Sequence, residues 1–162
     1  MTRSACELRP PPTLSWGFRN GLALLYALKT GKLVSATQSQ GRSYVTREDC
    51  ARTGAAVLLN ATGKAIFDVT GSASVTHEEI ASILSRLHGR SIQHVNVTPD
   101  EVEKGLVAAG IPQFAARRVR ELDEEAACGY RSIVSPAVTN LTGRVPMSVE
   151  DFLQTTVPAL IA

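Results

Sequence analysis

The 162-residue sequence lacks the patterns that most directly reveal a function. It has no G-x-G-x-x-G or G-x-x-G-x-x-G pattern, the glycine fingerprint that holds a pyrophosphate in dinucleotide-binding folds. It also has no G-x-S-x-G elbow of a serine hydrolase. The residues given therefore exclude a self-contained dinucleotide-binding turn of the usual kind and a serine-hydrolase nucleophile.

Cysteines and long apolar runs are also scarce. Cys6, Cys50 and Cys128 are odd in number and far apart, which excludes a disulfide framework and zinc-ligand spacing. Free thiols fit a reducing compartment, and Cys50, near a predicted helix start, is interpreted as a small packing residue. No apolar run approaches the roughly 20 residues that span a bilayer. We therefore expect a cytoplasmic protein without a membrane partner.

An excess of charge of one sign is missing as well. The 17 basic and 15 acidic residues leave a net charge of +2, which argues against nucleic acid as a partner. The run from Arg117 to Glu125 contains i, i+4 pairs of opposite charge and is interpreted as a solvated helix face. His77, His88 and His94 have no further ligands at metal-site spacing, so no metal centre is predicted.

Helix starts are the clearest signals that are present. At several places a hydroxyl residue precedes a carboxylate by three positions, the spacing of a capping box, in which each side chain satisfies a backbone amide. These pairs predict helix caps rather than catalytic carboxylates: Thr46/Asp49, Thr76/Glu79, Thr98/Glu101 and Ser148/Asp151.

Apolar spacing supplies the remaining elements, and their alternation predicts an α/β fold. We expect strands over residues 14–18, 65–70 and 92–97, a helix over 22–29 that ends at Gly31, and a loop or weak hairpin over 31–43. We also expect helices over about 99–109 and 112–128 and a final helix that Pro158 stops.

Four segments in this order carry a family resemblance. They are Arg19-Asn20-Gly21 after a strand, Tyr44–Ala51 at a helix start, Phe67–Gly71, and Leu141–Phe152. Together they resemble the C-terminal half of NmrA-like NAD(P)-binding proteins, the atypical short-chain dehydrogenase/reductase group that includes NAD(P)H-dependent quinone oxidoreductases. The resemblance covers roughly residues 14 to 157.

The resemblance implies the C-terminal part of a Rossmann-type NAD(P)-binding fold with its smaller helical substrate-binding lobe. Residues 1–13 are expected to be a disordered leader, and residues 14–162 the C-terminal half of such a domain. The half that carries the glycine fingerprint in that family would be missing. Because parallel strands would then lack neighbours, we expect self-association or a partner that supplies the missing half.

The resemblance also implies where a site would lie. It places Arg19, Asn20 and Gly21 at the carboxyl end of a sheet strand, where Asn20 would lie beside nicotinamide and substrate. The alternative is a strand-to-helix turn that needs Asn-Gly for its backbone angles. Thr46 and Arg47 would approach the same cleft, and here a simple helix cap with a solvated arginine is favoured.

Three functions stay open at this point. The chain could be the substrate-binding part of an NAD(P)H-dependent quinone or carbonyl reductase, with Asn20 and the helices over about 99–109 and 112–128 orienting the acceptor. It could be a non-catalytic NmrA-like dinucleotide sensor, or an inactive truncated fragment. The Tyr-x-x-x-Lys proton relay of typical short-chain dehydrogenases is absent, since Tyr26 and Lys29 are only three positions apart.

Overall fold

The structure is a computed structural model that describes residues 7–9, 18–60 and 62–161. Parallel strands and helices alternate along the chain, as the sequence predicts for an α/β protein. In order, the elements are β1 (Glu7–Arg9), α1 (Phe18–Thr30), β2 (Lys32–Ser35), α2 (Arg47–Asn60), β3 (Ile66–Asp68), α3 (His77–His88), β4 (Gln93–Asn96), α4 (Pro99–Ala108), α5 (Gln113–Ala127), α6 (Ala137–Thr142) and α7 (Val149–Ile161).

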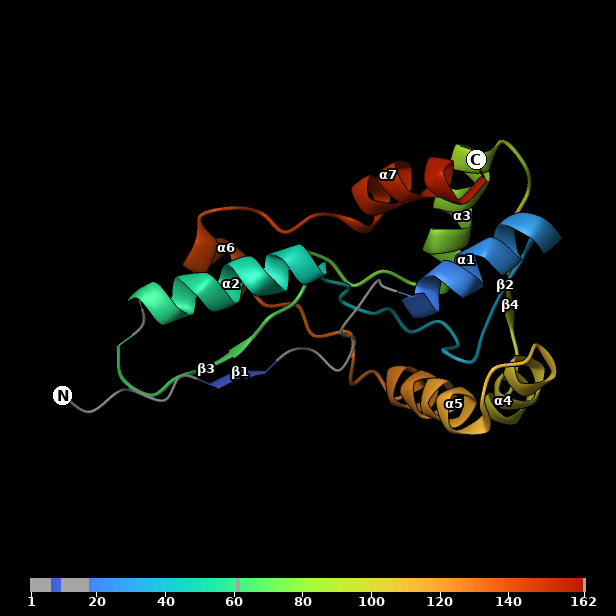
Figure 1. Cartoon of the computed structure of the whole chain (residues 1–162), viewed down its shortest axis with the longest axis horizontal. Helices are drawn as coiled ribbons and strands as arrows, with labels where there is room; N and C mark the ends of the chain where they lie inside the picture. Colours follow the sequence, from blue (N-terminus) through green and yellow to red (C-terminus); the bar gives the residue numbers. More distant parts are fainter. Residues whose placement is uncertain (1–6, 10–17, 61, 162) are drawn as a thin grey trace.

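The elements form two bodies, one at each end of the longest axis of the molecule (Figure 1). The small body contains β1, β3, α2 and α6, and the large body contains α1, β2, β4, α3, α4, α5 and α7. Each body has one pair of parallel strands, β1 with β3 and β2 with β4. In the β2–β4 pair, Leu33 lies opposite His94 and Ser35 lies opposite Asn96.

Local signals in the sequence explain why the helices begin and end where they do. Thr76 and Thr98 form complete capping boxes with Glu79 and Glu101, as predicted. After α3 the chain turns through Gly89, whose φ of 70° lies in the left-handed region that glycine reaches without strain. These caps fix the ends of the two helices that flank β4.

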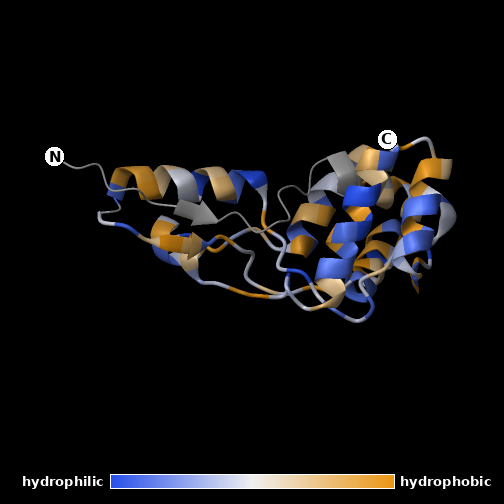
Figure 2. Ribbon diagram, turned by 90° about the horizontal axis from the view of Figure 1, so that it is seen from below, coloured by the Kyte–Doolittle hydropathy of each residue, from blue (hydrophilic) through white to orange (hydrophobic). Residues whose placement is uncertain are grey.

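Each body has its own apolar core. The core of the large body is formed mainly by α1, α3 and α7, with Leu84 and Leu153 fully buried at its centre. The core of the small body is only a cluster of Val45, Val69 and Val138. Consistent with this small core, Leu58 and Leu59 on α2 remain 88% and 83% exposed, and Figure 2 shows the apolar end of α2 on the outside.

The chain passes between the two bodies in the linking segments 36–46, 69–76, 128–136 and 143–148. The first three of these segments are hydrogen-bonded to one another. Arg42 and Val75 exchange both backbone hydrogen bonds at 2.9 Å, and the Ser43 N–H donates to the Arg131 carbonyl at 2.9 Å. The junction between the two bodies is therefore an ordered layer of hydrogen-bonded backbone rather than a set of independent linkers.

Several expectations about the elements were wrong. Residues 32–35 form strand β2 instead of a loop or hairpin, because parallel pairing with β4 stabilises a strand that buries only one large apolar side chain, Leu33. Pro158 lies inside α7 and does not stop it, since only three helical residues follow and few backbone bonds are lost. Within the expected leader, Glu7–Arg9 forms β1, and the other residues of 1–13 lie outside the described residues.

The close approach of two linking segments predicts that Gly71→Ala destabilises the protein. A Cβ atom at residue 71 would lie 1.9 Å from the Tyr44 carbonyl oxygen, so the backbone must shift. We expect the free energy of unfolding in urea to fall by about 1–3 kcal/mol. The control is Gly105→Ala in α4, where a Cβ meets nothing within 4 Å, and stability should rise by up to about 1 kcal/mol. Equal effects of the two substitutions would contradict this account.

Candidate functional site

The residues that the resemblance singled out lie on different bodies. Arg19, Asn20 and Gly21 form part of the first turn of α1, so helix replaces the predicted strand-to-helix turn. Phe18 precedes Leu22 by four residues and continues the apolar helical repeat, which explains the earlier start. Residues 14–17 of the predicted strand lie outside the described residues.

Thr46 and Arg47 lie at the start of α2 in the small body. The Thr46 hydroxyl accepts a hydrogen bond from the Asp49 N–H at 3.0 Å and donates to the Asp49 carboxylate at 2.7 Å. Arg47 is exposed. This geometry is the helix cap that the sequence favours.

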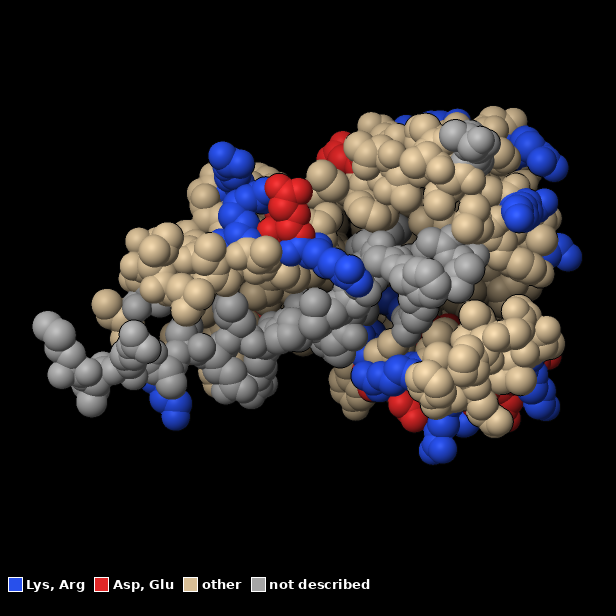
Figure 3. Space-filling view, viewed as in Figure 1, with Lys and Arg blue, Asp and Glu red and all other residues tan. Residues whose placement is uncertain are grey.

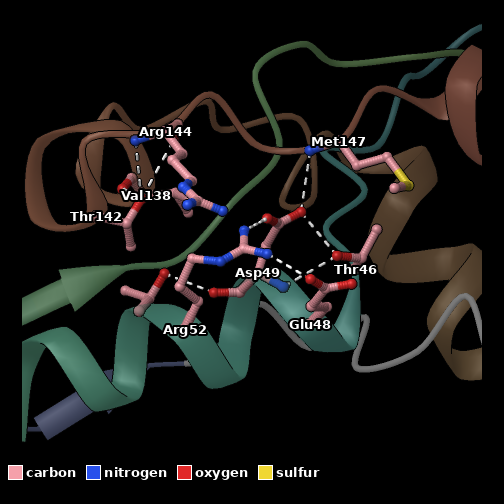
Figure 4. Close-up of polar contacts among 9 residues, drawn as sticks. Thr46, Glu48, Asp49, Arg52, Val138, Thr142, Arg144 and Met147 are labelled. Carbon is pink, nitrogen blue, oxygen red and sulfur yellow. Dashed lines mark hydrogen bonds and ion pairs between the residues drawn. The ribbon is translucent and has the colours of Figure 1, made fainter.

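Asp49 does more than the sequence suggested. Its carboxylate is buried and also accepts from the Arg52 guanidinium at 2.8 Å and from the Met147 N–H at 3.0 Å (Figure 4). A capping residue thus anchors the linking segment 143–148 to α2. The capping pattern concealed this second role, because the contact with Met147 spans 98 positions of sequence.

A cavity lies in the large body, at the carboxyl ends of the parallel strands β2 and β4. Ligands of open α/β sheets bind at this edge. The cavity has a volume of about 510 Å³, and it lies between the ends of β2 and β4, the start of α4 and the end of α5. It is lined by Ala36, Gln38, Asn96, Val97, Thr98, Pro99, Glu101, Glu124, Ala127 and Cys128.

A chain of hydrogen bonds supports the strand ends next to this cavity. The Ser35 hydroxyl lies 2.8 Å from His94 Nε2 and 3.1 Å from the Thr37 hydroxyl, which in turn lies 2.9 Å from His77 Nδ1. The two imidazole rings are stacked with centroids 5.7 Å apart. Burial lowers the pKa of His94, an effect that the nearby carboxylates of Glu78 and Asp123 oppose.

A buried ion pair holds the exit of β2. The carboxylate of Asp123 on α5 accepts from the Arg42 guanidinium at 2.5 Å and from the Ala36 N–H at 2.9 Å. The exposed fractions of the Arg42 and Asp123 side chains are only 4% and 6%. One carboxylate therefore joins α5, the end of β2 and a linking segment, and this corrects the interpretation of that part of α5 as a solvated face.

A second buried arginine lies beside this pair. The Arg131 side chain forms an ion pair with Glu125 of α5, and the backbone carbonyl of Arg131 accepts a hydrogen bond from the Ser43 N–H. Burial lowers the pKa of Arg131, while Glu125 acts in the opposite direction. Two ion pairs from the C-terminal part of α5 thus fix the linking segments against the helix that forms one wall of the cavity.

Gln38 gives the cavity a strained and well-anchored wall. Its φ of 54° makes it the one non-glycine residue with positive φ in the described part of the chain. Its N–H donates to Asn96 Oδ1 at 2.9 Å, which ties the loop after β2 to the end of β4. Strained backbone of this kind concentrates at binding sites and persists only where the surroundings hold it.

The charged side chains that line the cavity, Glu101 and Glu124, are both acidic. Arg120 is shared by Glu124, Asp100 and Glu103 at 3.2–3.5 Å, so one cation faces three carboxylates. Hydrogen bonds from Thr98 lower the pKa of Glu101, which keeps that carboxylate ionised. The space-filling view shows basic and acidic side chains interspersed over the α4–α5 side of the large body (Figure 3).

These observations define the class of protein first. The chain is an α/β protein with parallel strands and a ligand-sized cavity at their carboxyl edge. No described helix has the length and apolar character that crossing a membrane requires. No protein-family model matches the chain.

The comparison with known proteins then shows its relatives. The chain is 25% identical over 123 residues to the uncharacterized oxidoreductase YesF of Bacillus subtilis, covering 75% of this chain and 43% of YesF. The structure of the NADPH-dependent quinone oxidoreductase QOR2 from Escherichia coli matches 86% of this chain and 51% of its own, with a TM-score of 0.80 and 22% identity. The structure of the triphenylmethane reductase of Citrobacter sp. complexed with NADP(H) matches 82% of this chain and 46% of its own, with a TM-score of 0.77 and 24% identity.

The chain is thus similar in sequence and fold to oxidoreductases of the NmrA-like, atypical short-chain dehydrogenase/reductase kind, and the predicted resemblance and fold class are confirmed. It spans about half the length of the relatives it matches. QOR2 has also been solved in complex with NADPH. The cavity residues were not predicted, since the signal for them, polar residues directly after two parallel strands, requires that β2 be recognised as a strand.

The buried ion pair predicts that Asp123→Asn destabilises the protein strongly. Asparagine can still accept from the Ala36 N–H but leaves the Arg42 charge buried without a counterion. We expect the free energy of unfolding in urea to fall by about 3 kcal/mol. Glu121→Gln, which removes an exposed charge from the same helix, should change it by no more than about 0.5 kcal/mol. Similar losses in both variants would contradict the role assigned to Asp123.

The environment of His94 predicts a dependence of stability on pH. Because its pKa is lowered in the folded state, the folded protein binds protons less readily than the unfolded chain, whose histidines titrate near about 6.5. The contribution of neutral His94 to the free energy of unfolding is fully present above that pH and is lost as the pH falls through the lowered pKa of the folded state. In urea denaturation, His94→Gln should flatten the fall in stability below about pH 6.5, and an unchanged pH dependence would contradict this account.

Proposed function

We propose that this chain is the acceptor-binding part of an NAD(P)H-dependent oxidoreductase, and that the cavity at the carboxyl ends of β2 and β4 holds the molecule that is reduced. The observation that carries the proposal is the position and construction of this cavity. It lies at the sheet edge where ligands bind, and buried contacts hold its walls. The shared fold with QOR2 and triphenylmethane reductase supports the reaction class.

The chain's own residues would bind and orient the acceptor. NAD(P)H, when bound, supplies the hydride, and a quinone-like acceptor takes it with little help from a protein acid, which suits a chain without the Tyr-x-x-x-Lys relay. Asn96 and Gln38 would position the acceptor through their amides, and Ala36 and Val97 would exclude water from one side of it. By resemblance, Asn20 in the first turn of α1 would lie near the nicotinamide.

Within the described part of the chain, no segment forms a cradle for the pyrophosphate of the cofactor. The sequence has no glycine fingerprint, and among the described residues no glycine-rich turn connects a parallel strand to the start of a helix. We therefore propose that a second α/β unit holds that part of the cofactor. Residues 1–162 would then contribute the acceptor side of a composite site.

The small body is the face on which such a unit would dock. Its β1–β3 pair consists of two three-residue strands, and Leu58, Leu59 and Ile66 expose apolar surface beside it. Parallel sheets are stable when neighbouring strands and helices cover them, so this face is suited to another parallel α/β unit. The length of the relatives, about twice the matched part, agrees with this arrangement.

Filling the cavity should abolish acceptor binding. Ala127, the last residue of α5, lines the cavity, and Ala127→Trp would occupy much of it. We expect the affinity for 2-(hydroxymethyl)anthraquinone, measured by isothermal titration calorimetry, to fall at least about tenfold. The matched control is Ala108→Trp, at the exposed last position of α4. Equal affinity in the two variants, or no binding by the unsubstituted chain, would refute the proposed site.

A further inference from the structure

We infer that the cavity at the ends of β2 and β4 selects uncharged acceptors that present a carbonyl oxygen to the side-chain amide of Asn96. The inference rests on the proposed function, because it names the class of acceptor that the same cavity takes. It follows from the hydrogen-bond polarity of one side chain and from the charges that surround it.

The hydrogen bond to Gln38 fixes the orientation of the Asn96 amide. A backbone N–H can donate only to an acceptor, so the atom that faces the Gln38 N–H at 2.9 Å is the oxygen Oδ1. The Nδ2 group then remains as a donor on a residue that lines the cavity and is exposed to it. An amide with its oxygen occupied in this way offers hydrogens to a ligand, and the matching ligand atom is a carbonyl oxygen.

The strained backbone of Gln38 makes this orientation hard to reverse. Gln38 has a φ of 54°, and its N–H donates a hydrogen bond to Asn96. Two residues earlier, the Ala36 N–H donates to the buried carboxylate of Asp123. Rotation of the Asn96 amide by 180° would direct Nδ2 at a donor and leave the Gln38 N–H unsatisfied. The donor is thus preorganised before the ligand arrives, which lowers the cost of binding.

The charges of the cavity disfavour anionic ligands. Glu101 and Glu124 both line it, and Arg120, which forms an ion pair with Glu124, is shared with Asp100 and Glu103. The remaining walls include Ala36, Val97, Pro99 and Ala127, which suit an apolar ring. An uncharged ring that carries a carbonyl group satisfies all these features, whereas a sulfonated or carboxylated ring meets two carboxylates of like charge.

Asn96→Asp tests the hydrogen-bond polarity. Aspartate has the same shape and can still accept from the Gln38 N–H, but its other oxygen is an acceptor that repels a carbonyl oxygen. We expect the affinity for the uncharged 2-(hydroxymethyl)anthraquinone to fall roughly tenfold, with the midpoint of thermal unfolding unchanged. Asn140→Asp on α6 adds the same charge on the small body, and its affinity should equal that of the unsubstituted chain.

Glu124→Gln tests the charge selection. The unsubstituted chain should bind 2-(hydroxymethyl)anthraquinone roughly tenfold more tightly than anthraquinone-2-sulfonate at low ionic strength, since a fixed charge of the same sign opposes the sulfonate. Glu124→Gln should reduce this preference about threefold, mainly by strengthening sulfonate binding. Glu121→Gln on the same helix, outside the cavity lining, should leave the preference unchanged.

The outcomes separate this inference from the proposed function. If both anthraquinones bind equally well and Asn96→Asp has no effect, the inferred selectivity is wrong, although the cavity still binds acceptors. If neither compound binds to the unsubstituted chain, the proposed function fails and the inference fails with it. Both the inference and the proposed function are supported if three results are obtained together. The unsubstituted chain binds the uncharged compound more tightly than the sulfonate, Asn96→Asp weakens binding of the uncharged compound, and Glu124→Gln reduces the preference for it.

Discussion

The carboxylate of Asp123 is the contact on which the arrangement of the large body depends. It meets the Arg42 guanidinium and the Ala36 N–H at once, in surroundings from which water is almost excluded. A buried ion pair contributes little net stability compared with apolar packing, but it is intolerant of any other geometry. Its value here is specificity, since only one placement of α5 against the end of β2 satisfies both donors.

The candidate site is a consequence of that placement. The end of β2 reaches the end of β4 through the bond between Gln38 and Asn96, and α5 closes the cavity on the other side. The cavity therefore exists because elements from residues 36 to 128 are drawn to one edge by a few buried polar contacts. The ion pair between Arg131 and Glu125 stabilises the same edge. A site built in this way is rigid where a ligand would meet it.

Local features were predictable from the sequence, and contacts distant in sequence were not. The capping boxes at Thr76 and Thr98 follow from spacing within one helix. Strand β2 was missed because one buried leucine gives too weak a pattern, and its stability comes from β4. Asp123 was assigned to a solvated face because charge pairs along the helix explained the local sequence, whereas its true partner lies 81 positions away.

The passage of the chain through the linking segments has a consequence for folding. Neither body is built from one continuous stretch: the large body takes residues 18–35, 77–127 and 149–161, and the small body is completed by α6. The core of the large body needs Leu153 and Val157 of the last helix. Neither core can close before its last helix, α6 or α7, has been synthesised, so both bodies fold through contacts between distant segments, a topology that slows folding.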